Sequence, residues 1–123
     1  MLWLRRNLVC AIRGAGFVLR TQTSARIQLT AAIAVIGAGL FFGISRLEWL
    51  AVVAAIGAVL AAEAFNTALE SLADAVHPDR HPLVGRAKDC AAGAVLLTAI
   101  AAAAIGFIIF FPRILSWLTS LPT

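Results

Sequence analysis

Three of the six acidic residues of this chain share one short stretch, where their spacing suggests a chemical site. Glu63, Asn66, Glu70 and Asp74 follow one another at intervals of three, four and four residues. On an α-helix, residues at these intervals lie on one face. Carboxylate and amide oxygens suit Mg²⁺, which binds one or two carboxylates together with phosphate oxygens. The pattern therefore favours a metal-assisted site, with interhelical hydrogen bonding as the alternative that involves no chemistry.

Basic residues follow this polar face across a short loop. Two prolines mark the segment 77–82 as a loop, and Arg86, Lys88 and Asp89 come soon after it. Lys and Arg side chains bind phosphate, and a carboxylate within reach of an alcohol can take its proton. A metal, a cation and a base are the parts of a phosphoryl-transfer site. We therefore expect a phosphoryl donor from the cytoplasm and an acceptor alcohol from a bilayer.

The composition places these residues in a membrane protein. Of the 123 residues, 62% are hydrophobic and 13% are charged, whereas soluble domains have about 45–50% and about 25%. This composition excludes a soluble domain, a disordered chain and a disulfide scaffold, and the length supports one domain. The net charge of +4 is interpreted as cationic flanks of membrane helices, not as a nucleic-acid surface. Cys10 and Cys90 lie far apart and are interpreted as small buried or interfacial thiols.

Three spans are expected, over about residues 27–45, 49–75 and 87–112. The uncharged run 49–62 has only 14 residues, or about 21 Å of helix, which is too short to cross the hydrocarbon layer. After that run, no Gly or Pro interrupts the helix until Pro78. Glu63 therefore lies inside the membrane or at its inner boundary. A carboxylate in that position marks a functional site by default.

A surface helix is expected ahead of the spans, over about residues 1–26. Arg6, Arg13 and Arg20 are seven residues apart and share one helix face, as in basic helices that rest on an anionic membrane. Because Arg and Lys concentrate in this segment and in the 77–89 loop, both are predicted to be cytoplasmic. Three helices cannot fully enclose the charged face, so a homo-oligomer is expected.

Two motifs resemble those of the small bacterial integral-membrane diacylglycerol kinases and undecaprenol kinases. The first is Glu-Ala-Phe-Asn-Thr-Ala-Leu-Glu-x-x-x-Asp at 63–74, and the second is His-Pro-Leu-Val-Gly-Arg-Ala-Lys-Asp-Cys-Ala-Ala-Gly-Ala-Val at 81–95. The resemblance covers nearly the whole chain, so residues 1–123 are interpreted as one membrane kinase domain. It implies an all-α homotrimer in the bacterial inner membrane that uses ATP and Mg²⁺, with active sites at subunit boundaries.

The resemblance also implies roles for individual residues. Glu63 would be the general base on the lipid hydroxyl, Asn66 would support the catalytic site, and Glu70 would be a metal ligand. The residues implied to contact the nucleotide are Glu70, Asp79, His81, Lys88 and Asp89. Arg13 is expected to contact the lipid together with Glu63, whereas Asp74 matches the motif without an assigned role.

One departure from the family concerns the second metal ligand. The family carries a glutamate in a stretch like Arg-Thr-Glu-Arg-Asn-Phe-Arg-Ile-His, where this chain has Gln22 in the segment 20–28. A glutamine offers a carbonyl oxygen without charge, so weaker Mg²⁺ binding is expected, unless another acid serves.

The acceptor lipid and the alternative functions remain open at this point. The segments 26–28, 45–49 and 81–83 resemble the undecaprenol-kinase branch, while diacylglycerol is also plausible as the acceptor. Two other functions compete with a lipid kinase. One is a small intramembrane ion or proton carrier with Glu63 as its relay, and the other is a non-catalytic membrane assembly subunit.

Overall fold

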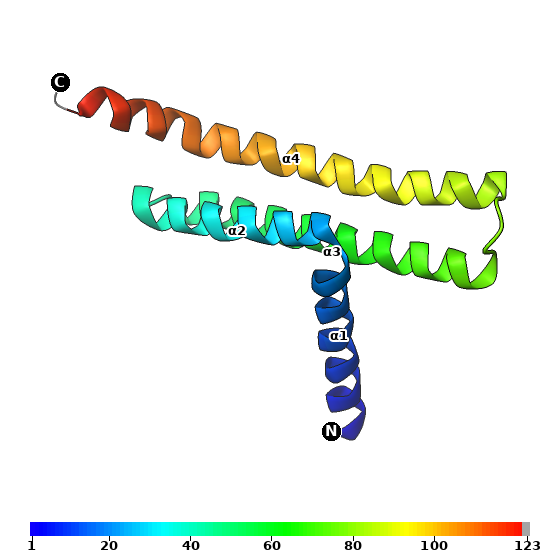
Figure 1. Cartoon of the computed structure of the whole chain (residues 1–123). Helices are drawn as coiled ribbons and strands as arrows, with labels where there is room; N and C mark the ends of the chain where they lie inside the picture. Colours follow the sequence, from blue (N-terminus) through cyan, green and yellow to red (C-terminus); the bar gives the residue numbers. More distant parts are fainter. Residues whose placement is uncertain (122–123) are drawn as a thin grey trace.

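The chain forms four consecutive α-helices joined by short connections (Figure 1). The structure is a computed structural model that describes residues 1–121. The helices are α1 (Leu2–Thr21), α2 (Thr23–Phe42), α3 (Arg46–Val76) and α4 (Pro82–Ser120). No strand occurs within residues 1–121. The predicted all-α architecture, with an N-terminal helix and three long apolar helices, is confirmed.

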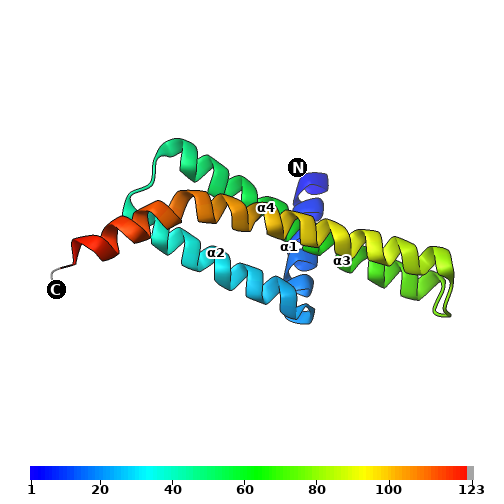
Figure 2. The same ribbon diagram turned by 90° about the horizontal axis from the view of Figure 1, so that it is seen from above.

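The three long helices have the length and composition needed to cross a membrane. They are α2 with 20 residues, α3 with 31 and α4 with 39. Because α3 and α4 are longer than α2, their hairpin extends past the start of α2 toward the connection at 77–81 (Figure 1). Figure 2 shows α4 running over both α2 and α3. The polar face predicted from the sequence begins beside α2, where Glu63 contacts Gln28, and continues toward this extended part of the hairpin.

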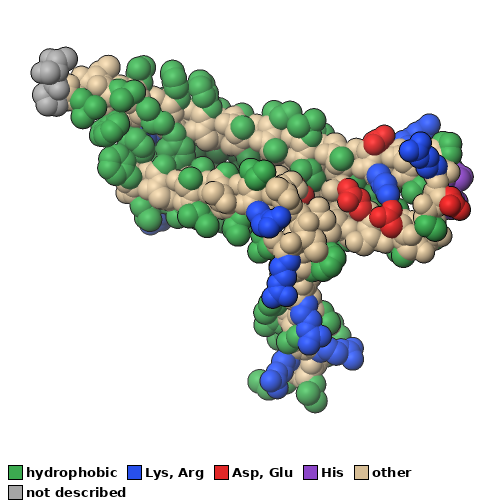
Figure 3. Space-filling model, in the orientation of Figure 1, with side chains coloured by type: hydrophobic (Ala, Val, Ile, Leu, Met, Phe, Trp, Pro, Cys, Tyr) green, Lys and Arg blue, Asp and Glu red, His purple; other side chains and the backbone are tan. Residues whose placement is uncertain are grey.

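Helix α1 points away from the bundle, across the direction of the long helices (Figure 1). If the long helices cross a bilayer, this direction places α1 along the membrane surface. Basic side chains run along α1, interspersed with apolar ones (Figure 3). The arrangement agrees with the basic amphipathic surface helix that the arginine spacing indicates.

The boundary between α1 and α2 differs from the sequence prediction. The surface helix was expected to reach about residue 26, but α1 ends at Thr21 and α2 begins at Thr23. Gln22 alone forms the joint, with an extended backbone (φ −105, ψ 115). No Pro or Gly marks this position. Val18 and Ala25 are both buried on either side of the joint, so packing at the junction, and not a local breaker, accompanies the change of direction.

The apolar core lies at the end of the bundle where α2 turns into α3. The turn uses Gly43 in the left-handed region (φ 62), which favours glycine because it lacks a Cβ. Ser45 and Glu48 then form a capping box that begins α3. Ile44 and Val52 are buried here against α4 residues such as Phe110.

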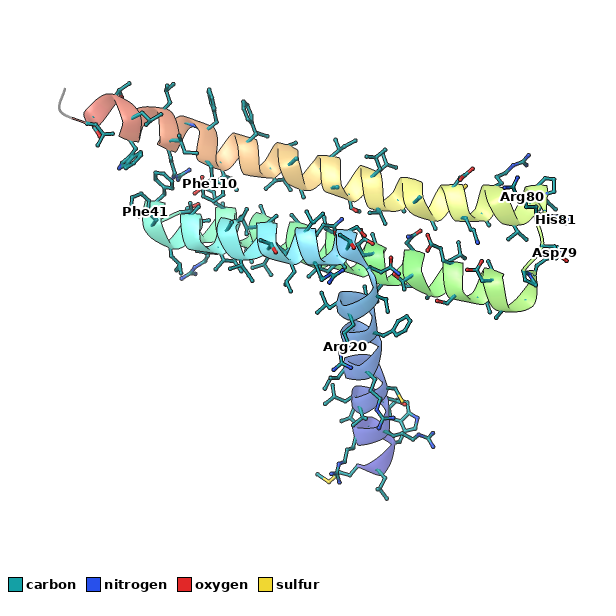
Figure 4. All side chains as sticks on the ribbon, in the orientation of Figure 1. Arg20, Phe41, Asp79, Arg80, His81 and Phe110 are labelled. Atoms are coloured by element: carbon teal, nitrogen blue, oxygen red, sulfur yellow. The ribbon has the colours of Figure 1, made fainter. Side chains whose placement is uncertain are left out.

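We call this region the 43–45 end and the opposite tip of the hairpin the 77–81 end. Figure 4 shows Phe41 and Phe110 at the first and Asp79, Arg80 and His81 at the second.

Helix α4 is longer than the span expected at about 87–112. It begins at Pro82, with the His81 side chain accepting a hydrogen bond from the Leu83 N–H, and Pro is favoured at the first helical position. It continues through Pro112 to Ser120, although an internal Pro removes one helical hydrogen bond. Contacts beyond Pro112 hold the last turns: Arg113 binds Glu48, and Trp117 packs edge-on against Phe41.

Few side chains are buried within the single chain. Large apolar residues are exposed along all four helices, among them Ile33, Val53, Leu97 and Phe107. Apolar faces of this extent suit contact with lipid tails or with further copies of the chain.

Candidate functional site

The polar face of α3 runs from a buried carboxylate to exposed ones. Glu63 is 2% exposed, Asn66 and Glu70 are half-buried, and Asp74 is exposed. The four residues occupy successive turns of one helix, as their spacing predicts. Acidic and basic side chains gather around the hairpin tip next to this face (Figure 3). The polar face therefore leads from the interior of the bundle to the charged 77–81 end.

The buried end of this face contains a contact between two helices. The Gln28 Nε2 of α2 donates a hydrogen bond of 2.9 Å to Glu63 Oε1. Thr67, which is buried one turn later, donates its hydroxyl to the Glu63 backbone oxygen at 2.8 Å. Within residues 1–121, no Lys, Arg or His forms an ion pair with Glu63. The Glu63 carboxylate is therefore held by an amide and left without a countercharge.

Two buried oxygens near this contact have no hydrogen-bond partner. They are Oε1 of Gln28 and Oδ1 of Asn66. The Asn66 Nδ2 group points the other way and donates to Glu70 Oε1 at 3.2 Å. Buried acceptors without partners are costly, so this region suits a ligand that brings a donor or a cation.

The oxygen set fits Mg²⁺ only in part. Glu70 and Asn66 Oδ1 are hard oxygen ligands of the kind that Mg²⁺ accepts. Within residues 1–121, however, no three His, Cys, Asp or Glu side chains converge to hold a metal by themselves. Mg²⁺ usually keeps waters and substrate phosphates in its coordination sphere. The residues present therefore fit a magnesium ion that arrives with a phosphate ligand.

The 77–81 end is polar and open. Lys88 of α4 forms an ion pair with Asp74 of α3, which links the polar residues of the two helices. A cavity of about 540 Å³ lies beside the pair, and its lining includes Asp79, Arg80 and His81. The His81 ring also contacts the His77 ring, with centroids 5.1 Å apart. This end offers both cationic and carboxylate side chains to a water-soluble ligand.

Other predicted site residues remain apart in the single chain. Arg13 is exposed on α1, and Asp89 is exposed on α4. Gln22 is half-buried at the α1–α2 joint and makes no hydrogen bond to Glu70, which accepts from Asn66 instead. The helix geometry still relates these two positions. Gln28 contacts Glu63 and lies about 9 Å along the helix axis from Gln22. Because α2 and α3 are antiparallel, Glu70, about 10 Å beyond Glu63 along α3, lies in the same direction from this contact as Gln22 does. Gln22 and Glu70 therefore lie at about the same level of the bundle.

An apolar cavity of about 400 Å³ lies between α2, α3 and α4. Its walls are mostly small and branched side chains, including Ala32, Val59 and Ala102. Gln28 is the only polar residue among the described residues that line it. The cavity therefore meets the polar site at the residue that holds Glu63.

Gln28 and Thr67 were not identified as site residues from the sequence. Gln28 lies in an uncharged run, where a single amide has no partner that the sequence can identify. Its position did offer one signal, because it is the only amide or charged residue within the span expected at 27–45, and buried amides need hydrogen-bond partners.

Comparison with known proteins identifies relatives over most of the chain. The family model described as prokaryotic diacylglycerol kinase matches residues 9–110. The undecaprenol kinase of Bacillus subtilis is 36% identical over 109 residues, which cover 89% of this chain and 89% of the relative. A diacylglycerol kinase of Synechocystis is 37% identical, covering 89% of this chain and 66% of the relative. A diacylglycerol kinase of Haemophilus influenzae is 28% identical, covering 82% and 86%.

Proposed function

The chain belongs to the prokaryotic diacylglycerol kinase family and is a lipid kinase of the membrane, and from this premise we propose where and how it acts. The proposed reaction transfers the γ-phosphoryl group of Mg-ATP to the hydroxyl of undecaprenol or diacylglycerol. The proposed site is the polar face of α3, from Glu63 to the 77–81 end. The names of the relatives do not favour an ion carrier or an assembly subunit.

The observation that carries this site is the buried, uncompensated Glu63 carboxylate. Its Oε1 accepts from Gln28, and no described side chain donates to Oε2. Glu63 Oε2 takes the proton of the lipid hydroxyl while the lipid oxygen forms a bond to the γ-phosphorus. The bond from this phosphorus to the β–γ bridging oxygen breaks, ADP leaves with the electron pair, and the proton on Glu63 then returns to water.

Glu70 is the proposed protein ligand of the magnesium ion, and Asn66 supports it. Asn66 donates to Glu70 Oε1 and keeps its own Oδ1 free for the metal or its waters. Gln22, at about the same level, is the proposed second ligand through its carbonyl oxygen. When bound, Mg²⁺ supplies charge neutralisation for the phosphate oxygens. The uncharged Gln22 makes this site weaker than one with two carboxylates.

The nucleotide is proposed to bind at the 77–81 end. Lys88 already pairs with Asp74, so its ammonium group is held at the mouth of the polar face and can contact phosphate oxygens. Asp79 and His81 line the adjacent cavity, which suits the remainder of the nucleotide. Asp89 is exposed one residue after Lys88 and completes the proposed set together with Glu70.

The lipid is proposed to approach from the bilayer below α1. Glu63 receives its hydroxyl, Arg13 on the surface helix contacts its head region, and the apolar cavity that ends at Gln28 offers space to a hydrocarbon chain.

We further propose that the N-terminus and residues 77–89 face the cytoplasm of a bacterial inner membrane. A homo-oligomer is proposed because the apolar faces and the polar site are incompletely covered in one chain, and its proposed number of three subunits rests on the resemblance to the family.

A lipid-acceptor panel tests this proposal. The purified protein is mixed with radiolabelled ATP and Mg²⁺ in detergent micelles that contain undecaprenol or diacylglycerol, and labelled lipids are separated by chromatography. Label is expected in at least one lipid and is expected to disappear in the Glu63→Ala and Glu70→Ala variants. Label in one lipid identifies the acceptor, and label in both indicates relaxed specificity. No label in either lipid contradicts the proposed acceptors.

A further inference from the structure

Gln28 stands out because it joins the two parts of the site. It comes from α2, is half-buried, and is the polar residue at the end of the apolar cavity. Its Nε2 lies 2.9 Å from Glu63 Oε1, while its own Oε1 is buried without a donor. The amide is therefore oriented by the carboxylate and by no other described partner.

The geometry points to Gln28 as the positioning residue for Glu63, so that Oε2 of Glu63 faces the lipid hydroxyl. This inference rests on the proposed function, in which Glu63 is the general base. An amide N–H that donates to Glu63 Oε1 restricts rotation of the carboxylate about the Cγ–Cδ bond. The remaining oxygen is then the one left for the substrate proton. Thr67 cannot take over this role, because its hydroxyl is already bonded to the Glu63 backbone oxygen.

The chemistry of the neighbouring groups explains why an amide suits this position. A Lys or Arg here would neutralise Glu63 and hold its proton-accepting oxygens in an ion pair. An apolar residue would leave Glu63 Oε1 buried without a hydrogen-bond donor, which is unfavourable. A neutral donor holds the carboxylate without removing its charge. Gln28 thus acts through Glu63 and needs no contact with the lipid.

Two substitutions separate positioning from packing. Gln28→Leu keeps approximately the side-chain volume and removes the donor, whereas Gln28→Glu keeps the shape and places an acceptor against Oε1. Thr30→Val is the matched control, because Thr30 is exposed on the same helix and bonds only to the Arg26 backbone oxygen. The full-length variants are assayed in micelles with whichever lipid the wild type phosphorylates, and kcat and both KM values are measured.

A positioning role predicts a loss in kcat and unchanged KM values. Misplacing a reacting group by about 1 Å can cost about 100-fold in rate, so we expect kcat to fall about 10- to 100-fold in both Gln28 variants. Thr30→Val should keep the wild-type kcat. In a Glu63→Asp background, Gln28→Leu should cost much less than in the wild type, because residues that act through each other are not additive.

Several results would overturn the inference. These are an unchanged kcat in either Gln28 variant, a raised lipid KM with kcat retained, or full additivity with Glu63→Asp. An equal loss in Thr30→Val would also overturn it. Should Gln28→Leu fail to give a folded protein by size exclusion, the polar, equally sized Gln28→Glu decides by the same constants. Wild-type protein that labels neither lipid contradicts the acceptor assignment as well, whereas an active wild type with unaffected Gln28 variants contradicts this inference alone.

Discussion

The two ends of the α3–α4 hairpin use charge in opposite ways. At the 43–45 end, Arg113 forms a two-pronged ion pair with Glu48, with N–O distances of 2.9 and 2.8 Å. Glu48 also accepts from the Ser45 backbone N–H. Toward the 77–81 end, Glu63 has an amide as its partner and no ion pair within residues 1–121, and two buried oxygens have no partner.

This difference separates structural charges from functional ones. Charges that complete each other within the chain stabilise the helix pair and have little capacity left for a ligand. Charges and acceptors that are incompletely paired cost stability, and a chain retains such groups where a ligand or a partner subunit completes them. We therefore expect substitutions at the 43–45 end to alter stability and those toward the 77–81 end to alter kinase activity.

The largest expected effect is that of Glu63→Gln. Removal of a general base, the role proposed for Glu63, typically costs about 10²- to 10⁴-fold in rate, and the neutral amide keeps the shape of the side chain. The kcat for lipid phosphorylation should fall by this factor in protein with an unchanged size-exclusion profile. Glu48→Gln is the matched control at the 43–45 end and should retain kcat. Equal activity of the two variants would contradict the distinction between the ends.

The next effect concerns packing at the 43–45 end. A Cβ on Gly39 would lie 2.7 Å from Trp49 Cη2 and 3.1 Å from Ile44 Cδ1. Gly39→Ala should therefore lower the free energy of unfolding by about 1–3 kcal/mol, as overpacked cores do. Gly37→Ala, where nothing lies within 4 Å, is the control on the same helix. The thermal midpoints of both variants in one detergent test this, and a Gly39→Ala midpoint equal to that of the control would refute it.

Gln22→Glu should strengthen the proposed magnesium site, whereas the two substitutions above weaken activity or stability. An added carboxylate at the level of Glu70 should improve Mg²⁺ binding by about tenfold, corresponding to about 1.4 kcal/mol. The Mg²⁺ concentration for half-maximal kinase activity should fall accordingly, with little change at saturating Mg²⁺. A Mg²⁺ titration identical to that of the wild type would exclude Gln22 as a metal ligand.

The smallest expected effect is that of Arg113→Gln. Its ion pair with Glu48 joins side chains that are 32% and 27% exposed, and such pairs contribute about 0.2–1 kcal/mol. The variant should unfold at a slightly lower temperature and keep wild-type kinase activity. The same substitution combined with Glu48→Gln should add little further loss. A large loss of activity in Arg113→Gln would show that the 43–45 end also serves the reaction.

Local patterns in the sequence are enough to predict the architecture and the residues of the polar face. An apolar run long enough to span a bilayer leaves helix as the only way to satisfy its backbone, apart from closed barrels. The spacing of Glu63, Asn66, Glu70 and Asp74 then determines their common face, because helical periodicity is a local property. The motifs at 63–74 and 81–95 are also local features of the sequence, and the family that they resemble is the one that comparison with known proteins shows.

The end of α1 and the contacts of the Glu63 side chain depend instead on how the helices pack against one another. The break at Gln22 has no Gly or Pro to signal it, since it depends on buried neighbours such as Val18 and Ala25. The continuation of α4 past Pro112 similarly depends on contacts of Arg113 and Trp117 with other helices. Gln28 and Glu63 are 35 residues apart, and no local pattern predicts such a pair. Their contact follows from how α2 packs against α3, which depends on side-chain shapes along both helices.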